Sequence, residues 1–205
     1  MNCRDTTVNT FFRKRINPLR VTALPSASPL SFLVVSTALH VGGKTEAIAA
    51  AMREQLESKG VPAEVFDLAA HPLPLCDGAS CYQDAGVIAA TAKVKAASAV
   101  VLCFPIYNYQ ANAAAKNFIE VTNDGWKYKV VGLVANAGAD RSYLASLPLA
   151  NSLMMDHRCL VVPRLVAVTA ADFGPEGKLT VESGATRRLD ELAAALVHLA
   201  PHWPA

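Results

Sequence analysis

Strand-length apolar runs alternate with helix-length segments from about residue 30 onwards, and this alternation constrains the fold more than any other feature of the chain. The runs 99–104 and 130–135 are apolar throughout and partly β-branched, which is typical of strands buried on both faces of a sheet. Parallel neighbours need helical crossovers, so we expect an α/β fold with an open, doubly wound, five-stranded parallel sheet and helices on both faces. The other strands are expected at 31–36, at 63–68, and at 159–162 with 165–168, a position broken by Pro163-Arg164. The helices are expected at 45–59, 84–97, 111–122, 142–156 and 183–199.

The composition indicates one soluble domain and gives no sign of a nucleic-acid or membrane partner. With 205 residues and 52% hydrophobic content, the chain can bury one full core. A formal net charge of +2, without a basic stripe interleaved with aromatics, gives no reason to expect a nucleic-acid partner. The apolar runs fall short of the roughly 20 residues that span a bilayer, so no membrane partner is expected. Five cysteines, an odd number, argue against a disulfide framework and favour a reducing compartment such as the cytoplasm.

The first 28 residues differ from the rest, because they carry five arginine and lysine residues against the single acid Asp5. Such a composition is typical of an organelle transit peptide, and equally of a disordered extension or an upstream start codon. We therefore divide the chain into a basic extension, 1–28, and one domain, 29–205. An organelle stays the alternative to the cytoplasm.

The strand 99–104 leads into Pro105-Ile106-Tyr107-Asn108-Tyr109, where we expect a ligand, because parallel sheets bind ligands at the carboxyl ends of their strands. A loop that only turned would favour Gly, Asp and Ser. This one offers an apolar edge, two flat aromatic rings and an amide, which suit a flat and partly polar ring system. The alternatives are that the tyrosines only cover the sheet end and that Asn108 only sets the turn.

The first strand also ends in a loop suited to a ligand, here an anion. Its backbone amides precede a helix, and Thr37, Lys44 and Thr45 add further donors. Residues 38–45 differ from a Walker A loop, G-x-x-x-x-G-K-[ST], only in having Ala38 at the first Gly. A nucleotide hydrolase also needs an acid at the end of an apolar strand, and the candidate strands offer none. The P-loop interpretation and a plain glycine-rich turn are kept only as alternatives.

These loops, together with Ala113-Ala114-Ala115-Lys116-Asn117 and the third loop Asn136-Ala137-Gly138, make residues 30–172 resemble the NAD(P)H-dependent FMN reductases of the flavodoxin-like fold. The resemblance implies a flavodoxin-like FMN-binding domain over 29–205, with a phosphate loop, a Pro-x-Tyr-Asn loop along the flavin ring and a third loop at its other edge. It implies no catalytic side chain and no metal. The FMN-binding residues it implies are Ser36, Thr37, Leu39, Gly43, Lys44, Thr45, Pro105, Ile106, Tyr107, Asn108, Tyr109, Asn136, Ala137 and Gly138.

The first loop departs from the family pattern Gly-Ser-x-Arg-x-Gly-Ser. Ser36 stands for the first Gly, Leu39 for the Arg and Gly43 for the second Ser. A charged hydrogen bond to phosphate is worth roughly 1.5 to 3 kcal/mol, so FMN would bind about tenfold or more weakly unless Lys44 replaces the Arg. FMN is then either a bound cofactor or an exchangeable substrate.

The implied activity is transfer of hydride from NADPH or NADH to FMN, followed by reduction of free flavin, a quinone or a similar small acceptor. Relatives of this type form homodimers or homotetramers with the flavin near the interface. The alternatives are a flavodoxin-like electron carrier, which a net +2 chain does not fit, and a flavin-free interaction domain. Cys76 and Cys81 are too few for an iron–sulfur cluster, and form either a redox switch or two unconnected small residues.

Overall fold

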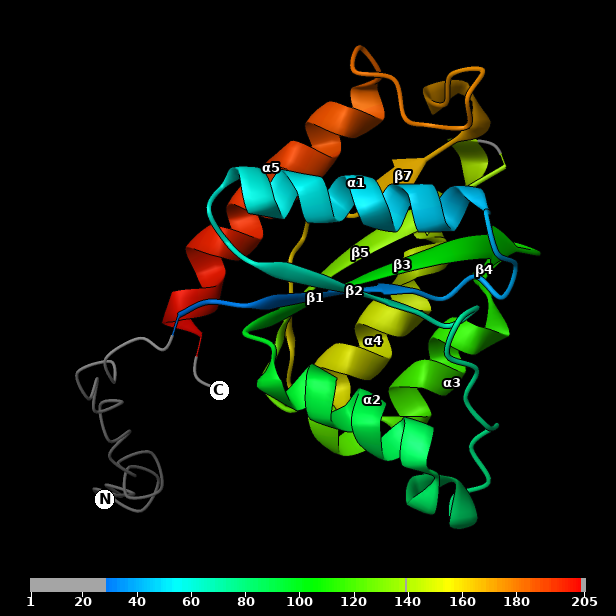
Figure 1. Ribbon diagram of the computed structural model, residues 1–205, viewed down its shortest axis with the longest axis vertical. Helices are drawn as coiled ribbons and strands as arrows, with labels where there is room; N and C mark the ends of the chain where they lie inside the picture. The colour runs from blue at the N-terminus through cyan, green and yellow to red at the C-terminus, as the bar shows by residue number, and fades with distance from the viewer. Residues whose placement is uncertain (1–28, 139, 204–205) are drawn as a thin grey trace, which may run out of the picture.

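The computed structural model describes residues 29–138 and 140–203, and its helices and strands alternate as predicted (Figure 1). The predicted basic extension, 1–28, lies outside the described residues. The strands are β1 (Phe32–Ser36), β2 (Ala63–Asp67), β3 (Ala99–Tyr107), β4 (Gln110–Ala111), β5 (Val130–Asn136), β6 (Leu160–Val161) and β7 (Val166–Val168). The α-helices are α1 (Lys44–Ser58), α2 (Ala85–Ala96), α3 (Ala113–Val121), α4 (Leu147–Met155) and α5 (Gly184–Leu199). Short 3-10 helices are η1 (Ser80–Gln83), η2 (Asn123–Gly125), η3 (Asp140–Ser146), η4 (Ala170–Asp172) and η5 (Ala200–His202).

The sheet has the strand order β2-β1-β3-β5-β6, and these strands run parallel. Strand β7 pairs with the later part of β5, so β6 and β7 share the fifth position of the sheet. Pro163 lies between them and has no amide proton for a sheet ladder. The predicted doubly wound sheet is therefore confirmed, in the 2-1-3-4-5 order of flavodoxin-like folds, with seven strands where five positions were predicted.

Helices α1 and α5 cover one face of the sheet, and α2, α3 and α4 cover the other (Figure 1). The central strands serve both cores, because successive side chains point to opposite faces. Val34 and Val101 lie in the core under α1 and α5, whereas Leu33 and Leu102 lie in the core under the other three helices. Burial on both faces explains why these strands are continuously apolar.

One predicted boundary was wrong near α4, the start of the helix. The helix predicted over 142–156 is interrupted: η3 comes first, and α4 begins only at Leu147. The physical reason is Pro148, which is tolerated in the first turn of a helix but breaks hydrogen bonding in its interior. Within the described part of the chain, every helix is too short or too polar to cross a membrane.

Candidate active site

Four loops meet at the carboxyl edge of the sheet and enclose a cleft of about 330 Å³. They follow β1, β3, β5 and β7, so the cleft lies where parallel sheets of this topology bind their ligands. The lining residues are Ala38, His40, Gly43, Lys44, Thr45, Pro105, Ile106, Tyr107, Asn136, Ala137, Gly138 and Ala170. The structure thus brings together most of the residues that were predicted for the site.

The first loop gives the cleft an anion-binding end. Helix α1 begins at Lys44, and the residue that precedes it, Gly43, supplies no side-chain cap. The first amide groups of a helix have no intrahelical acceptor, so those of Lys44 and Thr45 are available for an anion. The positive end of the helix dipole favours a phosphate at this position.

Two charged side chains modify this anion site. The ammonium group of Lys44 lies 5.0 Å from the centroid of the Phe173 ring, in a cation–π contact. The carboxylate of Glu46, in the first turn of α1, accepts a hydrogen bond of 2.7 Å from the amide of Gly42. Glu46 therefore occupies one amide of the phosphate loop and brings a negative charge to it. Acidic residues in a first helical turn are common, so this competition could not be predicted from the residue type and its position.

The two residues at the start of the first loop lie behind the cleft. Ser36 and Thr37 are fully buried. The hydroxyl of Thr37 donates to Oδ1 of Asn112 at 2.9 Å, and Nδ2 of Asn112 donates back to the carbonyl of Thr37 at 2.7 Å. Asn112 also caps α3 by accepting from the amide of Ala115. These bonds fix the first loop to the start of α3.

Asn112, which positions the first loop, is a residue that sequence reasoning missed. A signal existed, because an asparagine directly before an alanine-rich helix is typical of an N-cap. Its second role, holding Thr37, depends on a contact between segments 75 residues apart, which local sequence does not reveal.

The second loop is a β-hairpin. Strand β3 continues to Tyr107, and β4 returns antiparallel to it, with Tyr107 paired to Gln110. Asn108 and Tyr109 have φ angles of 51° and 60°, as the two central residues of a type I′ turn require. The loop predicted over residues 105–109 was therefore too long, because only Asn108 and Tyr109 form the turn. Pro105 stays in the strand because it is the last residue of the ladder with β5, where its missing amide proton does not interrupt pairing.

The third loop is tied to the first. Nδ2 of Asn136 donates to the hydroxyl of Thr45 at 3.1 Å, and the amide of Ala137 donates to the carbonyl of Val168 at 2.7 Å. The end of β5 thus holds the beginning of α1 on one side and the end of β7 on the other. Ala170, from the loop after β7, completes the lining and was not predicted.

Besides Ser36 and Thr37, three further predicted residues lie outside the cleft lining. Leu39 borders a separate apolar hollow of about 210 Å³, together with Leu75 and Phe118, and is 69% exposed. Asn108 and Tyr109 form the tip of the hairpin beside Tyr107. Their roles toward a ligand remain predictions.

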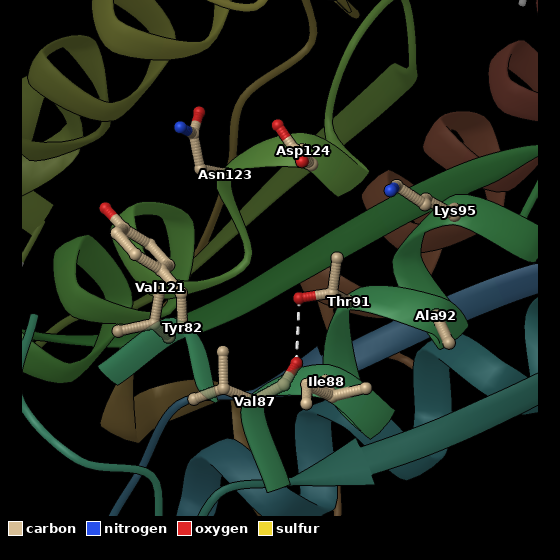
Figure 2. A pocket seen from close by; sticks show the side chains of 9 residues that line it. All are labelled: Tyr82, Val87, Ile88, Thr91, Ala92, Lys95, Val121, Asn123 and Asp124. Carbon is tan, nitrogen blue, oxygen red and sulfur yellow. Dashed lines mark hydrogen bonds between the residues drawn. The ribbon is translucent and has the colours of Figure 1, made fainter. Parts of the chain in front are cut away.

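A larger cavity, of about 600 Å³, lies elsewhere, between α2 and the segment that ends α3 (Figure 2). Its walls include Ile88, Thr91 and Val121, and the Thr91 hydroxyl is already bonded to the Val87 carbonyl. It lies among the helices on one face of the sheet, and no residue of a β-strand lines it; the first turn of α2 borders it, but Asp84 already caps that turn by accepting from the amide of Val87. We therefore assign the chemistry to the smaller cleft.

The residues of the cleft fit FMN. Free amides at the start of α1 suit a phosphate, and Pro105, Ile106 and Tyr107 give one apolar wall for a flat ring. The fold and this cleft together define a flavodoxin-like protein of the FMN-binding class. The chain belongs to the NADPH-dependent FMN reductase family, whose family model matches residues 30–172.

Relatives and solved structures agree with this assignment. The chain is 26% identical over 171 residues to an NADPH azoreductase of Bacillus sp. (strain OY1-2), covering 82% of this chain and 87% of that protein. It is 28% identical over 149 residues to an FMN-dependent NADPH-azoreductase of Staphylococcus aureus, covering 69% and 78%. Its fold matches the X-ray structure of an oxidoreductase from Corynebacterium diphtheriae with a TM-score of 0.68 and 22% identity, over 85% of this chain and 99% of that one.

The predicted activity class is confirmed by this membership. The chain is an FMN-dependent oxidoreductase that uses NAD(P)H, and FMN and NADPH are its cofactors. The alternatives of a P-loop hydrolase, a flavin-free domain and a pure electron carrier are set aside, because the family is one of NADPH-dependent reductases.

Proposed function

We propose that the cleft binds FMN, that NAD(P)H reduces it there, and that a small diffusible compound takes the electrons. The observation that carries the proposal is the convergence of three predicted loops on one cleft at the carboxyl edge of the sheet. Free flavin, quinones and azo compounds are all candidate acceptors, and the two azoreductase relatives favour azo compounds.

In this proposal the protein binds and orients, and the bound flavin accepts hydride and passes electrons on. The amides of Lys44 and Thr45 hold the phosphate, and the wall from Pro105 to Tyr107 lies along the ring. Amide groups of the hairpin 107–109 stabilise negative charge at the pyrimidine edge. Tyr107 is 62% exposed, so this wall is accessible to a second ring compound from solvent.

FMN is proposed to bind weakly enough to exchange. Leu39 brings no charge to the phosphate, Lys44 contacts Phe173, and Glu46 opposes an anion at Gly42. Each feature lowers phosphate affinity relative to a loop with an arginine. The enzyme then uses FMN partly as a substrate that leaves reduced.

We also propose a homodimer or homotetramer in the cytoplasm, with no nucleic-acid partner. Large apolar side chains are exposed on the surface, including Leu75 (79%), Tyr109 (66%) and Leu144 (56%). Covering them with a second copy would favour association. Sedimentation velocity of the full chain tests this: a monomer at every concentration would contradict it.

We further propose that the domain begins at residue 29. Deleting residues 1–28 tests this boundary, and the thermal stability of the shortened protein should equal that of the full chain.

The visible spectrum tests the central proposal. Purified protein with added FMN should show altered flavin absorbance on binding, and NADPH should bleach it under anaerobic conditions. Asn108→Ala should raise the Kd for FMN, whereas Asn123→Ala, a matched change on η2 far from the cleft, should not. FMN that stays yellow with NADPH, or equal affinity in both variants, would contradict the corresponding assignment.

A further inference from the structure

Two cysteines on the loop between β2 and α2 lie close to each other. The sulfur atoms of Cys76 and Cys81 are 4.0 Å apart. Cys76 is half-buried, and Cys81 is buried against Val87 and Val121. The separation in sequence is five residues, so the contact depends on how this loop is folded. A disulfide needs the sulfurs at about 2.0 Å, which calls for only a small movement.

The loop is held in a shape that brings the two sulfurs together. The carboxylate of Asp77 accepts hydrogen bonds from the amides of Ala79 (2.9 Å) and Cys81 (3.0 Å) and from the hydroxyl of Ser80. Gly78 has a φ angle of +72°, so the chain reverses there and η1 carries Cys81 back towards Cys76. Asp77 and Gly78 thus act as a turn between the cysteines.

The loop is also anchored to α3. Asn117 accepts a hydrogen bond of 2.8 Å from the amide of Cys76, and its own amide group donates to the carbonyl of Pro74 at 2.9 Å. One side chain therefore fixes the backbone of Cys76 in place.

The two thiols have opposite environments. The hydroxyl of Tyr82 lies 3.5 Å from the sulfur of Cys76, and this hydrogen bond lowers the pKa of Cys76 and raises the pKa of Tyr82 to about 12. Tyr82 consequently keeps its proton, and its hydroxyl is placed to donate a hydrogen bond to Cys76 when that thiol ionises. Burial raises the pKa of Cys81, which stays a thiol. A half-buried cysteine of lowered pKa beside a buried cysteine of raised pKa is the arrangement of an attacking and a resolving cysteine.

We propose that Cys76 and Cys81 form a peroxide-reactive dithiol that closes to a reversible disulfide. In the first step the Cys76 sulfur attacks one oxygen of hydrogen peroxide, the O–O bond breaks, and the leaving hydroxide takes a proton to become water. Cys76 is now a sulfenic acid. The Cys81 sulfur then attacks it, the S–O bond breaks, a second water leaves, and the S–S bond forms. Two thiols lose two electrons and two protons, and one peroxide becomes two waters.

A small external dithiol reverses the reaction by thiol–disulfide exchange. The proposal does not depend on flavin binding, because no residue of the loop lines the cleft.

The other two described cysteines provide internal controls. Cys103 lies in β3 and is fully buried, and burial strongly raises its pKa. Burial also raises the pKa of Cys159 to about 11, and its sulfur donates to the carbonyl of Trp126. Neither thiol has the exposure or the low pKa that peroxide reactivity requires.

The experiment treats the reduced full chain with one equivalent of hydrogen peroxide, followed by blocking of free thiols and mass spectrometry without reduction. Trypsin releases the segment between Lys59 and Lys93 as one peptide, which contains both cysteines and no other. We expect this peptide to lose two hydrogens and escape blocking, and to regain both on treatment with dithiothreitol. Cys103 and Cys159 should react only after denaturation. A peptide with oxidised Cys76 and a free Cys81 thiol would overturn the proposal.

Two variants separate the roles of the residues. With Cys81→Ser, the Cys76 sulfenic acid should persist and be captured by dimedone, whereas the wild type should give little adduct. Equal capture in both proteins would contradict resolution by Cys81. With Tyr82→Phe, the midpoint of the pH profile for alkylation of Cys76 should move upward. An unchanged midpoint would remove Tyr82 from the proposal.

Discussion

At the scale of single residues, Glu46 has the clearest effect on what the cleft can bind. Its carboxylate accepts a hydrogen bond from the amide of Gly42, the residue before Gly43 and Lys44 of the cleft lining. A phosphate bound as proposed would have to displace this carboxylate or bind beside it. Either event costs free energy that a riboflavin molecule, which has no phosphate, does not meet.

Replacing Glu46 by glutamine should strengthen FMN binding. Removing one like charge near the phosphate is worth about 1 kcal/mol, or about fivefold in Kd, while the glutamine can still accept from Gly42. Fluorescence titration with FMN and with riboflavin measures the effect, and riboflavin affinity should not change. The matched control is Glu57→Gln, on the last turn of the same helix. Equal improvement for both flavins would show that charge at the phosphate is not the cause.

Sequence reasoning found the residues whose role is local. Lys44, Thr45 and Pro105 were identified from their positions at strand ends and a helix start, and all three line the cleft. It missed Glu46 and Asn112, because their roles depend on which group lies opposite in space. Leu39 was placed at the phosphate by analogy with an arginine, yet its apolar side chain borders a separate apolar hollow beside Leu75.

At the scale of elements, Asn112 links a helix cap to the site. Asn112→Ala should lower the free energy of unfolding by about 2 kcal/mol, since α3 loses its cap and the buried Thr37 hydroxyl loses its acceptor. FMN affinity should fall as well, because the first loop loses its anchor. Denaturant unfolding and flavin titration measure the two effects.

The control for this change is Asp84→Ala. Asp84 caps α2 by accepting from the amide of Val87, away from the cleft. It should show a comparable loss of stability with unchanged FMN affinity. If both variants lose affinity together, general destabilisation explains the result.

The turn of the hairpin after β3 offers a second prediction for this level, on stability and on FMN binding. Tyr109 adopts a left-handed backbone that costs a non-glycine residue about 1 kcal/mol, so Tyr109→Gly should raise the melting temperature by several degrees. The same change should weaken FMN binding if the ring of Tyr109 contacts the flavin. A drop in melting temperature would show that the tyrosine side chain contributes more than the turn loses.

The order of elements could be predicted because period and length are local properties of a sequence. Strands such as 99–104 and helices such as α5 were found within a few residues. The hairpin at 105–111 was not, since Asn108-Tyr109 lacks the glycine that usually marks a type I′ turn. The split of the fifth strand followed from Pro163, which the sequence did display.

At the scale of the whole molecule, His157 makes stability depend on pH. Its ring is 7% exposed, and burial is the main cause that lowers its pKa below 6.5, with Asp156 acting in the opposite sense and Lys116 in the same sense. The unfolded chain therefore binds a proton at a higher pH than the folded one. The contribution of His157 is complete above pH 6.5 and decreases as the pH falls towards its folded pKa.

Melting temperatures measured from about pH 7.5 to about pH 5.5 check this sign. The wild type should lose stability over this range, and His157→Gln should lose less. His198→Gln, at an exposed position on α5, is the matched control and should follow the wild type. If melting temperature fell equally with pH in all three proteins, His157 would not be the cause of the pH dependence.

The divided fifth position of the sheet has a further consequence for how copies of this protein meet. The edge strands β6 and β7 are only two and three residues long, and Pro163 lies between them. This edge of the sheet therefore presents few free amide and carbonyl groups in register. Short, proline-interrupted borders do not template the addition of a foreign strand. Copies that associate here cannot extend one continuous sheet through this border, and the chain is protected from fibrous aggregation along it.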